Sequence, residues 1–328
     1  GFVHRWLEKL SKRCERLTVI CLEKGECGLP EPVQVLSLGK EYRQSRLMYV
    51  LRFCQYIRRL SREHDVVLVH MNPIYVVMGF LLWRLWRKKV FLWYNHEYGN
   101  MIARVAVKMA QTVFFTSPFS FASRYLNSWR MPAGIDTDMF APDIAVQRTE
   151  NALLYVGRIA PVKKVGVLIE ALRLLERQGI NFFLNIAGAP GKADLAYYQT
   201  IKKHAQELED AGKLRFLGKV PNYQTPRLYQ QSQILINLSP PGLFDKTVLE
   251  AMACETLVLV SSPAFQDMLP AACMFKEGDL EDLAAKIEGL LGLPEEKKQA
   301  YGIQFRQHVV EKQSLDRLIN QLEIKFSS

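Results

Sequence analysis

Two cations, Arg158 and Lys163, stand in the segment "YVGRIAPVKKVGVLIEAL", where a strand-like apolar run gives way to a helical pattern. The first turn of a helix offers free backbone N–H groups and partial positive charge, so it attracts phosphate. The two side chains add full charges suited to a diphosphate, although neither GxxxxGK[ST] nor GxGxxG is present. Taken alone, the segment is equally compatible with a solvated basic loop that contains an ordinary glycine turn.

A single acid, Glu250, interrupts the apolar helical stretch in "DKTVLEAMACETLVLVSS", residues 245–262. A carboxylate can accept hydrogen bonds from both hydroxyls of a diol. The alternative is an exposed glutamate on a helix surface. A third segment, "NIAGAPGKAD", places Gly188 directly after a strand-like run. Together, these segments indicate a cradle for a nucleoside diphosphate.

Three histidines follow or begin predicted elements: His96 in "FLWYNHEYG", His70 in "VLVHMNP" and His4 near the N-terminus. A lone histidine is usually structural, but one that follows a strand is a candidate for a site. The "DTD" at 136–138 suggests a manganese-binding DxD, which we reject because it lies in a linker. This motif therefore does not indicate a metal site.

Composition limits the class of protein. The 328 residues suggest about two domains, and 49% of them are hydrophobic, enough for two cores. The six cysteines contain no CxxC pair, which favours a reduced, cytoplasmic protein. No apolar run reaches the roughly 18 residues of a membrane span, and no leader peptide is expected.

The excess positive charge is confined to the first half of the chain. Residues 1–148 hold 22 Lys and Arg against 12 Asp and Glu, whereas residues 149–328 hold 21 of each. This asymmetry predicts an anionic partner for the first domain. We expect that partner to be an anionic membrane surface or a lipid-phosphate acceptor rather than a nucleic acid.

Short apolar runs alternate with longer amphipathic ones. The expected strands are 17–22, 33–38, 65–70, 90–94, 112–116, 152–156, 182–187, 214–217, 234–238 and 257–260. The expected helices are 2–14, 46–63, 74–87, 100–110, 163–178, 193–211, 223–231, 246–254, 279–291, 294–308 and 313–325. The alternation predicts two α/β domains with mostly parallel sheets, joined by a linker at 131–151.

The sequence resembles the retaining GT-B glycosyltransferases of glycosyltransferase family 4. The resemblance is carried by "YVGRIAPVKKVGVLIEAL", "FLGKVPNYQTPRLYQQSQILINLSP", "DKTVLEAMACETLVLVSS" and "GIDTDMF". It implies two Rossmann-like domains that face across a cleft: 1–140 on the acceptor side, 141–310 on the donor side, and a helix at 311–328 that returns to the first domain.

The resemblance also assigns roles. It implies that Arg158 and Lys163 hold the donor diphosphate, that Glu250 binds the donor ribose, and that His96 meets the transferred sugar. It also implies that no metal and no cofactor is needed. The catalytic residues expected are Arg158, Lys163 and His96. The residues expected to bind the donor are Gly157, Arg158, Lys163, Gly188, Val220, Asp245, Lys246, Thr247 and Glu250.

The sequence departs from the family pattern at two places. Gly242 stands where the family has the first glutamate of its E-x7-E pair, and "LFD" at 243–245 replaces Gly-Phe-Gly. In addition, "GFVHRWLEKL" corresponds to the end of the family's first loop and the helix after it. One strand of the first domain is therefore expected to be absent.

The expected function is sugar transfer from a nucleoside diphosphate to a sugar, lipid-phosphate or polysaccharide acceptor, with retained configuration. An inactive GT-B binding or regulatory subunit is the alternative, and a sugar epimerase lacks support in the motifs. We expect a peripheral location on the inner face of the membrane. Two predicted helices carry basic arcs, Arg5, Lys9, Lys12, Arg13 and Arg16 on one and Arg52, Arg58, Arg59 and Arg62 on the other, and "FLLWRLWRKKVFLW" adds Trp83 and Trp86.

Overall fold

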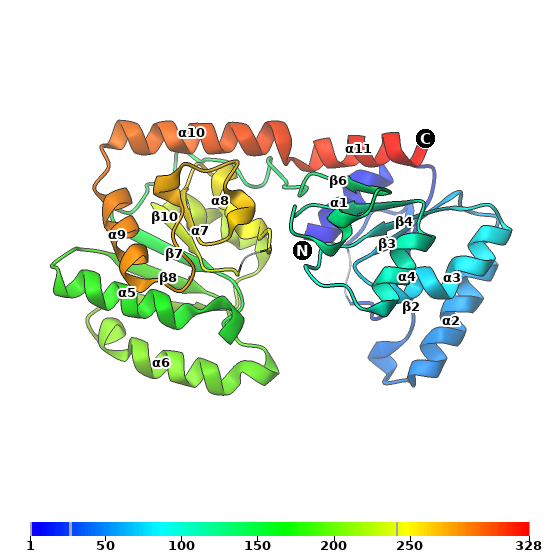
Figure 1. Cartoon of the computed structure of the whole chain (residues 1–328), viewed down its shortest axis with the longest axis horizontal. Helices are drawn as coiled ribbons and strands as arrows, with labels where there is room; N and C mark the ends of the chain where they lie inside the picture. The colour runs from blue at the N-terminus through cyan, green and yellow to red at the C-terminus, as the bar shows by residue number, and fades with distance from the viewer. Residues whose placement is uncertain (1, 26–27, 241, 328) are drawn as a thin grey trace. The chain divides into compact units, whose positions relative to one another are not determined.

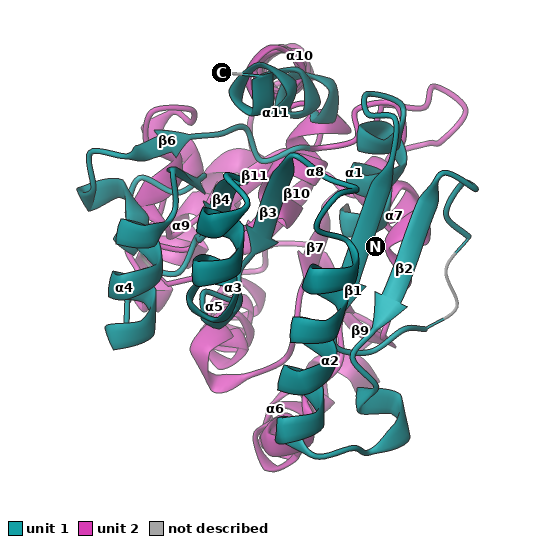
Figure 2. Ribbon diagram, turned by 90° about the vertical axis from the view of Figure 1, so that its right-hand side faces the viewer, with its two compact units in different colours: residues 1–134, 315–328 teal, residues 135–314 magenta. Residues whose placement is uncertain are grey.

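The computed structural model describes residues 2–25, 28–240 and 242–327. The chain divides into two compact units, unit 1 with residues 1–134 and 315–328 and unit 2 with residues 135–314 (Figure 2). The sequence pattern suggests divisions after residues 140 and 310 instead. Cys27 lies outside the described residues, and the other five cysteines are free thiols.

Unit 2 is built on a five-stranded parallel sheet in the order β11-β10-β7-β8-β9. Its strands are β7 (Ala152–Val156), β8 (Phe183–Ala187), β9 (Leu214–Gly218), β10 (Ile234–Asn237) and β11 (Leu257–Val260). The first strand, β7, lies at the centre, with β8 on one side and β10 on the other. Ligands of such sheets bind where the strand order reverses, outside the carboxyl ends of the strands.

Two layers of helices cover this sheet (Figure 1). One layer contains α5 (Val165–Arg177), α6 (Leu195–Asp210) and α9 (Leu280–Leu291), and the other contains α7 (Thr225–Gln231), α8 (Lys246–Ala253) and α10 (Glu295–Lys312). Strands β10 and β11 are buried at every position. Their continuous apolar runs follow from this burial on both faces.

The described part of unit 1 contains six parallel strands in two sheets, a pair β1-β2 and a four-stranded sheet β3-β4-β5-β6. They are β1 (Leu17–Cys21), β2 (Val33–Ser37), β3 (Val66–His70), β4 (Lys89–Trp93), β5 (Thr112–Phe115) and β6 (Ser128–Arg130). Figure 2 shows β1 and β2 side by side in this unit. The parallel sheets of both units confirm the α/β, Rossmann-like fold expected from the sequence. Strand β6 was not expected, because only three residues form it.

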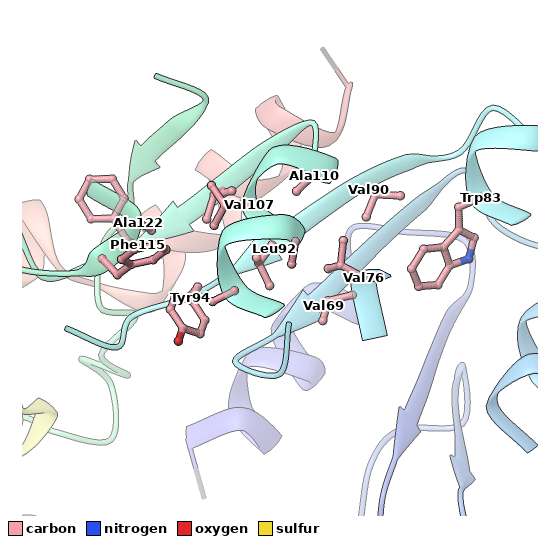
Figure 3. Close-up of a cluster of buried hydrophobic side chains, with 14 of the residues drawn as sticks. Val69, Val76, Trp83, Val90, Leu92, Tyr94, Val107, Ala110, Phe115 and Ala122 are labelled. Atoms are coloured by element: carbon pink, nitrogen blue, oxygen red, sulfur yellow. The ribbon is translucent and has the colours of Figure 1, made fainter. Parts of the chain in front are cut away.

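The helices of unit 1 are α1 (Phe2–Ser11), α2 (Arg46–Arg59), α3 (Ile74–Leu85), α4 (Met101–Met109) and α11 (Leu315–Ser327). Strand β4 separates two cores. Val90 and Leu92 pack with α2, α3 and α4, whereas Phe91 and Trp93 pack with Trp6 of α1 and with α11. Figure 3 shows the first of these clusters. The alternation follows from the two-residue period of a strand.

The sequence pattern predicts that one strand of the first domain is absent, and the sheets of the two units differ at one place. In unit 2, β7 lies between β8 and β10, but within the described part of unit 1 no strand pairs between β1 and β3. All five residues of β1 are only half-buried, although "LTVIC" is an apolar run of the kind found in central strands. Within the described residues, β1 and β3 therefore each have one edge that pairs with no strand.

Two expectations about the surface of unit 1 are wrong. Trp83 is buried within the first core cluster (Figure 3), so it does not lie at the surface. The first helix ends at Ser11, so Lys12, Arg13 and Arg16 do not continue a basic helical arc. No described helix combines the length and the apolar character that a bilayer crossing demands.

Candidate functional site

The candidate site lies in unit 2, at the carboxyl ends of β7, β8 and β10. The loop after β7 begins with Gly157, whose N–H donates to the Ala187 carbonyl at 3.0 Å. Gly188, directly after β8, packs so closely that an added methyl group would overlap the Gly157 carbonyl oxygen. A packing requirement therefore explains the glycine at 188, apart from any ligand.

Arg158 follows in the same loop and points into solvent. Its side chain is 60% exposed, and its Nε lies 3.8 Å from Asp194 Oδ2. The buried Tyr155 hydroxyl donates to the Arg158 carbonyl at 3.0 Å and so fixes the backbone there. Arg158 is thus an exposed cation on an anchored loop, free to turn toward an anion.

Lys163 ends a short 3-10 turn (Pro161–Lys163) before α5 and points into the sheet edge. Its Nζ donates to Asp245 Oδ2 at 2.7 Å and to Ser239 Oγ at 2.7 Å. The side chains of Lys163 and Asp245 are only 17% and 20% exposed. This ion pair spans the point between β7 and β10 where the strand order reverses.

Asp245 is also the N-cap of α8. Its Oδ1 accepts hydrogen bonds from the Thr247 N–H at 3.4 Å and from the Thr247 hydroxyl at 3.2 Å. Its Oδ2 accepts from Asn237 at 3.3 Å and from Ser239 at 2.9 Å. Burial would raise the pKa of Asp245, but the charge and hydrogen bonds of Lys163 and its neighbours outweigh burial and lower it.

Glu250 lies one turn inside α8 and is buried, with 6% of its surface exposed. Its Oε2 accepts from the Tyr229 hydroxyl at 2.9 Å, and its Oε1 lies 3.5 Å from the Asn222 amide nitrogen. Burial raises the pKa of Glu250 against these hydrogen bonds and the nearby Lys246. Burial likewise lowers the pKa of Lys246 to about 7, opposed by Glu250.

Val220 is half-buried in the loop after β9. His96 belongs to unit 1, where its side chain is exposed and its ring meets that of Tyr94 edge to face at 5.3 Å. His70 is an exposed side chain whose ring lies beside Trp6 and Trp93.

The first acid of the "DTD" motif, Asp136, stabilises the backbone of a turn. Asp136 is buried, and its Oδ1 accepts hydrogen bonds from the N–H groups of Asp138 at 3.3 Å and Met139 at 3.2 Å. Such a pattern is typical of a carboxylate that stabilises a turn.

Sequence reasoning missed four members of the site: Asn222, Tyr229, Asn237 and Ser239. Asn237 and Ser239 stand in "INLSP", a segment already identified as a strand-to-helix loop, and two polar residues at a buried strand end are a signal that was available. Tyr229 had no such signal, because an aromatic residue on an amphipathic helix usually belongs to a core.

The solved structures similar to this chain share its fold. Anabaena HepE in complex with UDP and glucose matches with a TM-score of 0.79 and 16% identity over 100% of this chain and 96% of that chain. Sucrose-phosphate synthase of Thermosynechococcus elongatus matches with a TM-score of 0.81 and 16% identity over 99% and 92%. Because the identities are low, these similarities establish the GT-B fold alone.

Curated relatives match over shorter stretches. The O-antigen chain mannosyltransferase B of Escherichia coli is 30% identical over 110 residues, 33% of this chain and 28% of that protein. The D-inositol 3-phosphate glycosyltransferase of Mycolicibacterium smegmatis is 27% identical over 137 residues, 39% and 31% respectively. The matched part of the chain thus spans about a third of the length of these relatives.

The family model described as glycosyl transferases group 1 matches residues 137–308, which is more than half of the chain. This stretch contains the whole cluster around Lys163, Asp245 and Glu250. The chain belongs to the glycosyl transferases group 1 family.

Proposed function

We propose that this protein transfers a sugar from a nucleoside diphosphate donor to an acceptor, with retention of configuration, as a member of glycosyltransferase family 4. The observation that carries the proposal is the meeting of Lys163, Asp245 and the first turns of α8 at the switch point of the unit 2 sheet. Retention and the family 4 assignment rest on the resemblance of the motifs.

The donor diphosphate is assigned to the loop after β7. Lys163, at the end of that loop, extends its ammonium to Ser239 Oγ, and the exposed Arg158 supplies a second cation from the same loop. These groups stabilise the charge that develops on the departing diphosphate, and losing one such contact typically costs about 2.7–4 kcal/mol of barrier. The chain's own side chains supply this stabilisation, so the proposal includes no metal and no cofactor.

The donor ribose is assigned to Glu250. One oxygen of its carboxylate is committed to Tyr229, while the other has only the long contact with Asn222. A carboxylate oxygen in this state retains acceptor capacity for a ribose hydroxyl. Gly157, Gly188, Val220, Lys246 and Thr247 belong to the proposed donor site through the resemblance, as does His96 as the residue that meets the transferred sugar.

The relatives guide the proposed acceptor and nucleotide. HepE was solved with UDP and with UDP-glucose, and one relative is an O-antigen chain mannosyltransferase. We therefore propose a UDP- or GDP-sugar as the donor and a lipid-linked or polysaccharide precursor as the acceptor.

A screen of UDP- and GDP-sugars by thermal shift tests the donor. A bound donor at 100 times its Kd stabilises the protein by about 2.7 kcal/mol. Turnover of the stabilising donor, measured as release of the nucleoside diphosphate, is expected to fall at least about 100-fold in Arg158→Ala. No stabilisation by any nucleotide sugar would contradict the proposal.

An inactive binding or regulatory subunit is the second candidate function. It is favoured by Gly242, which leaves the position of the family's first glutamate without a carboxylate. Donor binding without turnover in the presence of lipid-linked acceptors would favour this candidate. Turnover that is lost in Arg158→Ala would exclude it.

We also propose that unit 1 docks on the anionic inner face of a membrane. Leu47 and Leu51 of α2 and Leu81 and Leu85 of α3 are exposed, and these two helices pack against each other. Exposed cations accompany them at Arg58, Arg59, Arg62, Arg84 and Arg87. Each cation near an anionic surface contributes about 1 kcal/mol, screened by salt.

Basic residues of α1 and of the segment that follows it are paired with acids and do not belong to this docking surface. Lys9 pairs with Asp316 at 2.8 Å, Arg13 pairs with Glu323 at 3.5 Å, and Arg16 pairs with Glu63. Arg52 of α2 is likewise turned inward, toward the Leu38 carbonyl. The proposal therefore rests on the outer faces of α2 and α3 and the residues that follow them.

Co-sedimentation with liposomes tests the docking surface. Binding is expected to require anionic lipid, to fall with salt, and to be lost when Arg58, Arg59 and Arg62 become Gln. The matched control changes Arg173, Arg177 and Arg215 of unit 2 to Gln. Equal binding to neutral liposomes, or no binding to anionic ones, would contradict the proposal.

A further inference from the structure

We propose that Asp245 is a positioning residue: it holds the Lys163 ammonium in one orientation, so that a single N–H of Lys163 is directed at the ligand. Asp245 would then not bind the transferred sugar itself. The identity of the ligand, a nucleoside diphosphate, rests on the proposed function, whereas the hold of Asp245 on Lys163 does not.

The carboxylate of Asp245 has no acceptor capacity left for a sugar hydroxyl. Its Oδ2 accepts from Lys163 at 2.7 Å, Ser239 at 2.9 Å and Asn237 at 3.3 Å. Its Oδ1 accepts from the backbone and hydroxyl of Thr247 at 3.4 and 3.2 Å. An ionised carboxylate offers about four lone-pair sites, and five donors already meet this one.

The ammonium of Lys163, in contrast, retains one donor. A lysine carries three N–H groups. Among the described residues, two of these groups have partners, Asp245 Oδ2 and Ser239 Oγ, both at 2.7 Å. Two short hydrogen bonds fix the direction of the third N–H, which is the group left for a phosphate oxygen.

The surroundings strengthen the interaction between the Lys163 ammonium and the Asp245 carboxylate. The two side chains are largely buried, so water screens their attraction weakly. Asn237 and Ser239 also restrain each other, since Ser239 N–H donates to Asn237 Oδ1 at 3.1 Å. The cluster is therefore built from the ends of two strands and one helix cap, which can hold an ammonium to within a few tenths of an ångström.

The ion pair between Lys163 and Asp245 determines how much net charge this part of the site carries. Lys163 and Asp245 together are neutral, so Lys163 contributes a directed N–H rather than net positive charge. Tyr155, Tyr229 and Glu250 also lie within electrostatic reach of Asp245. Net positive charge near the diphosphate then has to come from Arg158 and the helix N-termini.

Asp245→Asn removes the carboxylate and keeps the helix cap, because Asn caps helices as well as Asp. The matched control is Asp279→Asn. Asp279 caps α9 through the Asp282 N–H at 3.1 Å and also lies near a lysine, Lys276, at 3.5 Å. Both variants should give the circular dichroism spectrum of the parent protein.

The first measurement is lysine acetylation with trace reagent at pH 8, quantified for each lysine by mass spectrometry. Without the carboxylate, the Lys163 amine loses its short charged hydrogen bond to Asp245 and can reach the reagent, so Lys163 labelling should rise at least about tenfold. Lys164, which pairs with Glu277 at 2.6 Å, is the internal control and should not change. Asp279→Asn should leave Lys163 labelling unchanged.

The second measurement is the affinity for UDP and GDP, by calorimetry, in a double-mutant cycle with Lys163→Met. Asp245→Asn alone should weaken binding about tenfold, because the third N–H of Lys163 is no longer directed at the phosphate. In the Lys163→Met protein, Asp245→Asn should have no further effect. A purely structural role of Asp245 would not give this coupling.

The outcomes separate the inference from the proposed function. Unchanged Lys163 labelling in Asp245→Asn, or an equal loss of affinity in the Lys163→Met background, would overturn the inference. If the parent protein binds neither UDP nor GDP while Lys163 labelling rises as expected, the donor assignment is wrong and the hold on Lys163 is supported. Should Asp245→Asn not fold, Ser239→Ala removes the second anchor of Lys163 and is expected to raise its labelling as well; no rise would overturn the inference.

Discussion

At the scale of single residues, Glu250 is buried, and one of its two carboxylate oxygens has only a long contact with Asn222. Glu250→Gln keeps the size of the side chain and an acceptor for the Tyr229 hydroxyl, but it removes the charge offered to a ribose diol. A hydrogen bond to a charged group contributes about 1.5–3 kcal/mol, so we expect donor affinity to fall roughly 10- to 100-fold.

Asp138→Asn is the control for Glu250→Gln, because Asp138 lies in the turn capped by Asp136. We expect its donor affinity to equal that of the parent protein by calorimetry. Equal losses in the two variants would contradict both the ribose assignment and the exclusion of Asp138 from the site.

The stability of unit 2 is expected to depend on pH because Lys246 is buried. Burial lowers its pKa to about 7, so between about pH 7 and 10 the unfolded chain binds a proton that the folded chain does not. Stability therefore rises with pH in this window, with a slope of up to about 1.4 kcal/mol per pH unit.

Lys246→Met is expected to remove this slope and to stabilise the protein most near pH 6–7. Urea denaturation at pH 6, 7, 8 and 9 measures the difference between the two proteins. An unchanged slope in Lys246→Met would mean that Lys246 keeps its charge in the folded state.

At the scale of elements, α11 completes the second core of unit 1. Leu318 is fully buried there with Trp6, Phe91 and Phe114. Leu318→Ala is expected to cost about 2.7–5 kcal/mol, because a buried leucine leaves a cavity when it is truncated.

Ile324 on the same helix is the matched control, since it is 66% exposed. Ile324→Ala is expected to change stability by no more than about 0.5 kcal/mol. Chemical denaturation of both variants, followed by circular dichroism, distinguishes them. A loss below about 1 kcal/mol in Leu318→Ala would show that α11 packs only weakly on unit 1.

At the scale of the whole molecule, the residues proposed to bind the nucleotide all belong to unit 2. We expect UDP to slow amide hydrogen exchange in residues 157–164 and 237–250 and to leave unit 1 unchanged, because the nucleotide contacts proposed above all lie in residues 151–265. Hydrogen-exchange mass spectrometry of the intact chain measures this. Protection confined to unit 1 would place the nucleotide elsewhere.

The sequence by itself determined the α/β class and most of the elements. Strands such as β10 and helices such as α5 can be predicted from the sequence because their periods of two and 3.6 residues are local properties. The loops after β7 and before α8 could also be located, since ligands of parallel sheets bind at strand ends. Lys163 and Glu250 were found this way, whereas the boundaries of α1 and the short β6 were not.

The tertiary structure decided which of these residues meet. Lys163 and Asp245 are 82 positions apart, and Lys9 and Asp316 are 307 apart, so no local pattern could pair them. The same holds for Trp83, whose burial depends on the neighbouring α2 and not on its own helix. Long-range packing fixes which side of an element is covered and which charges are neutralised, and that information lies in the folded chain as a whole.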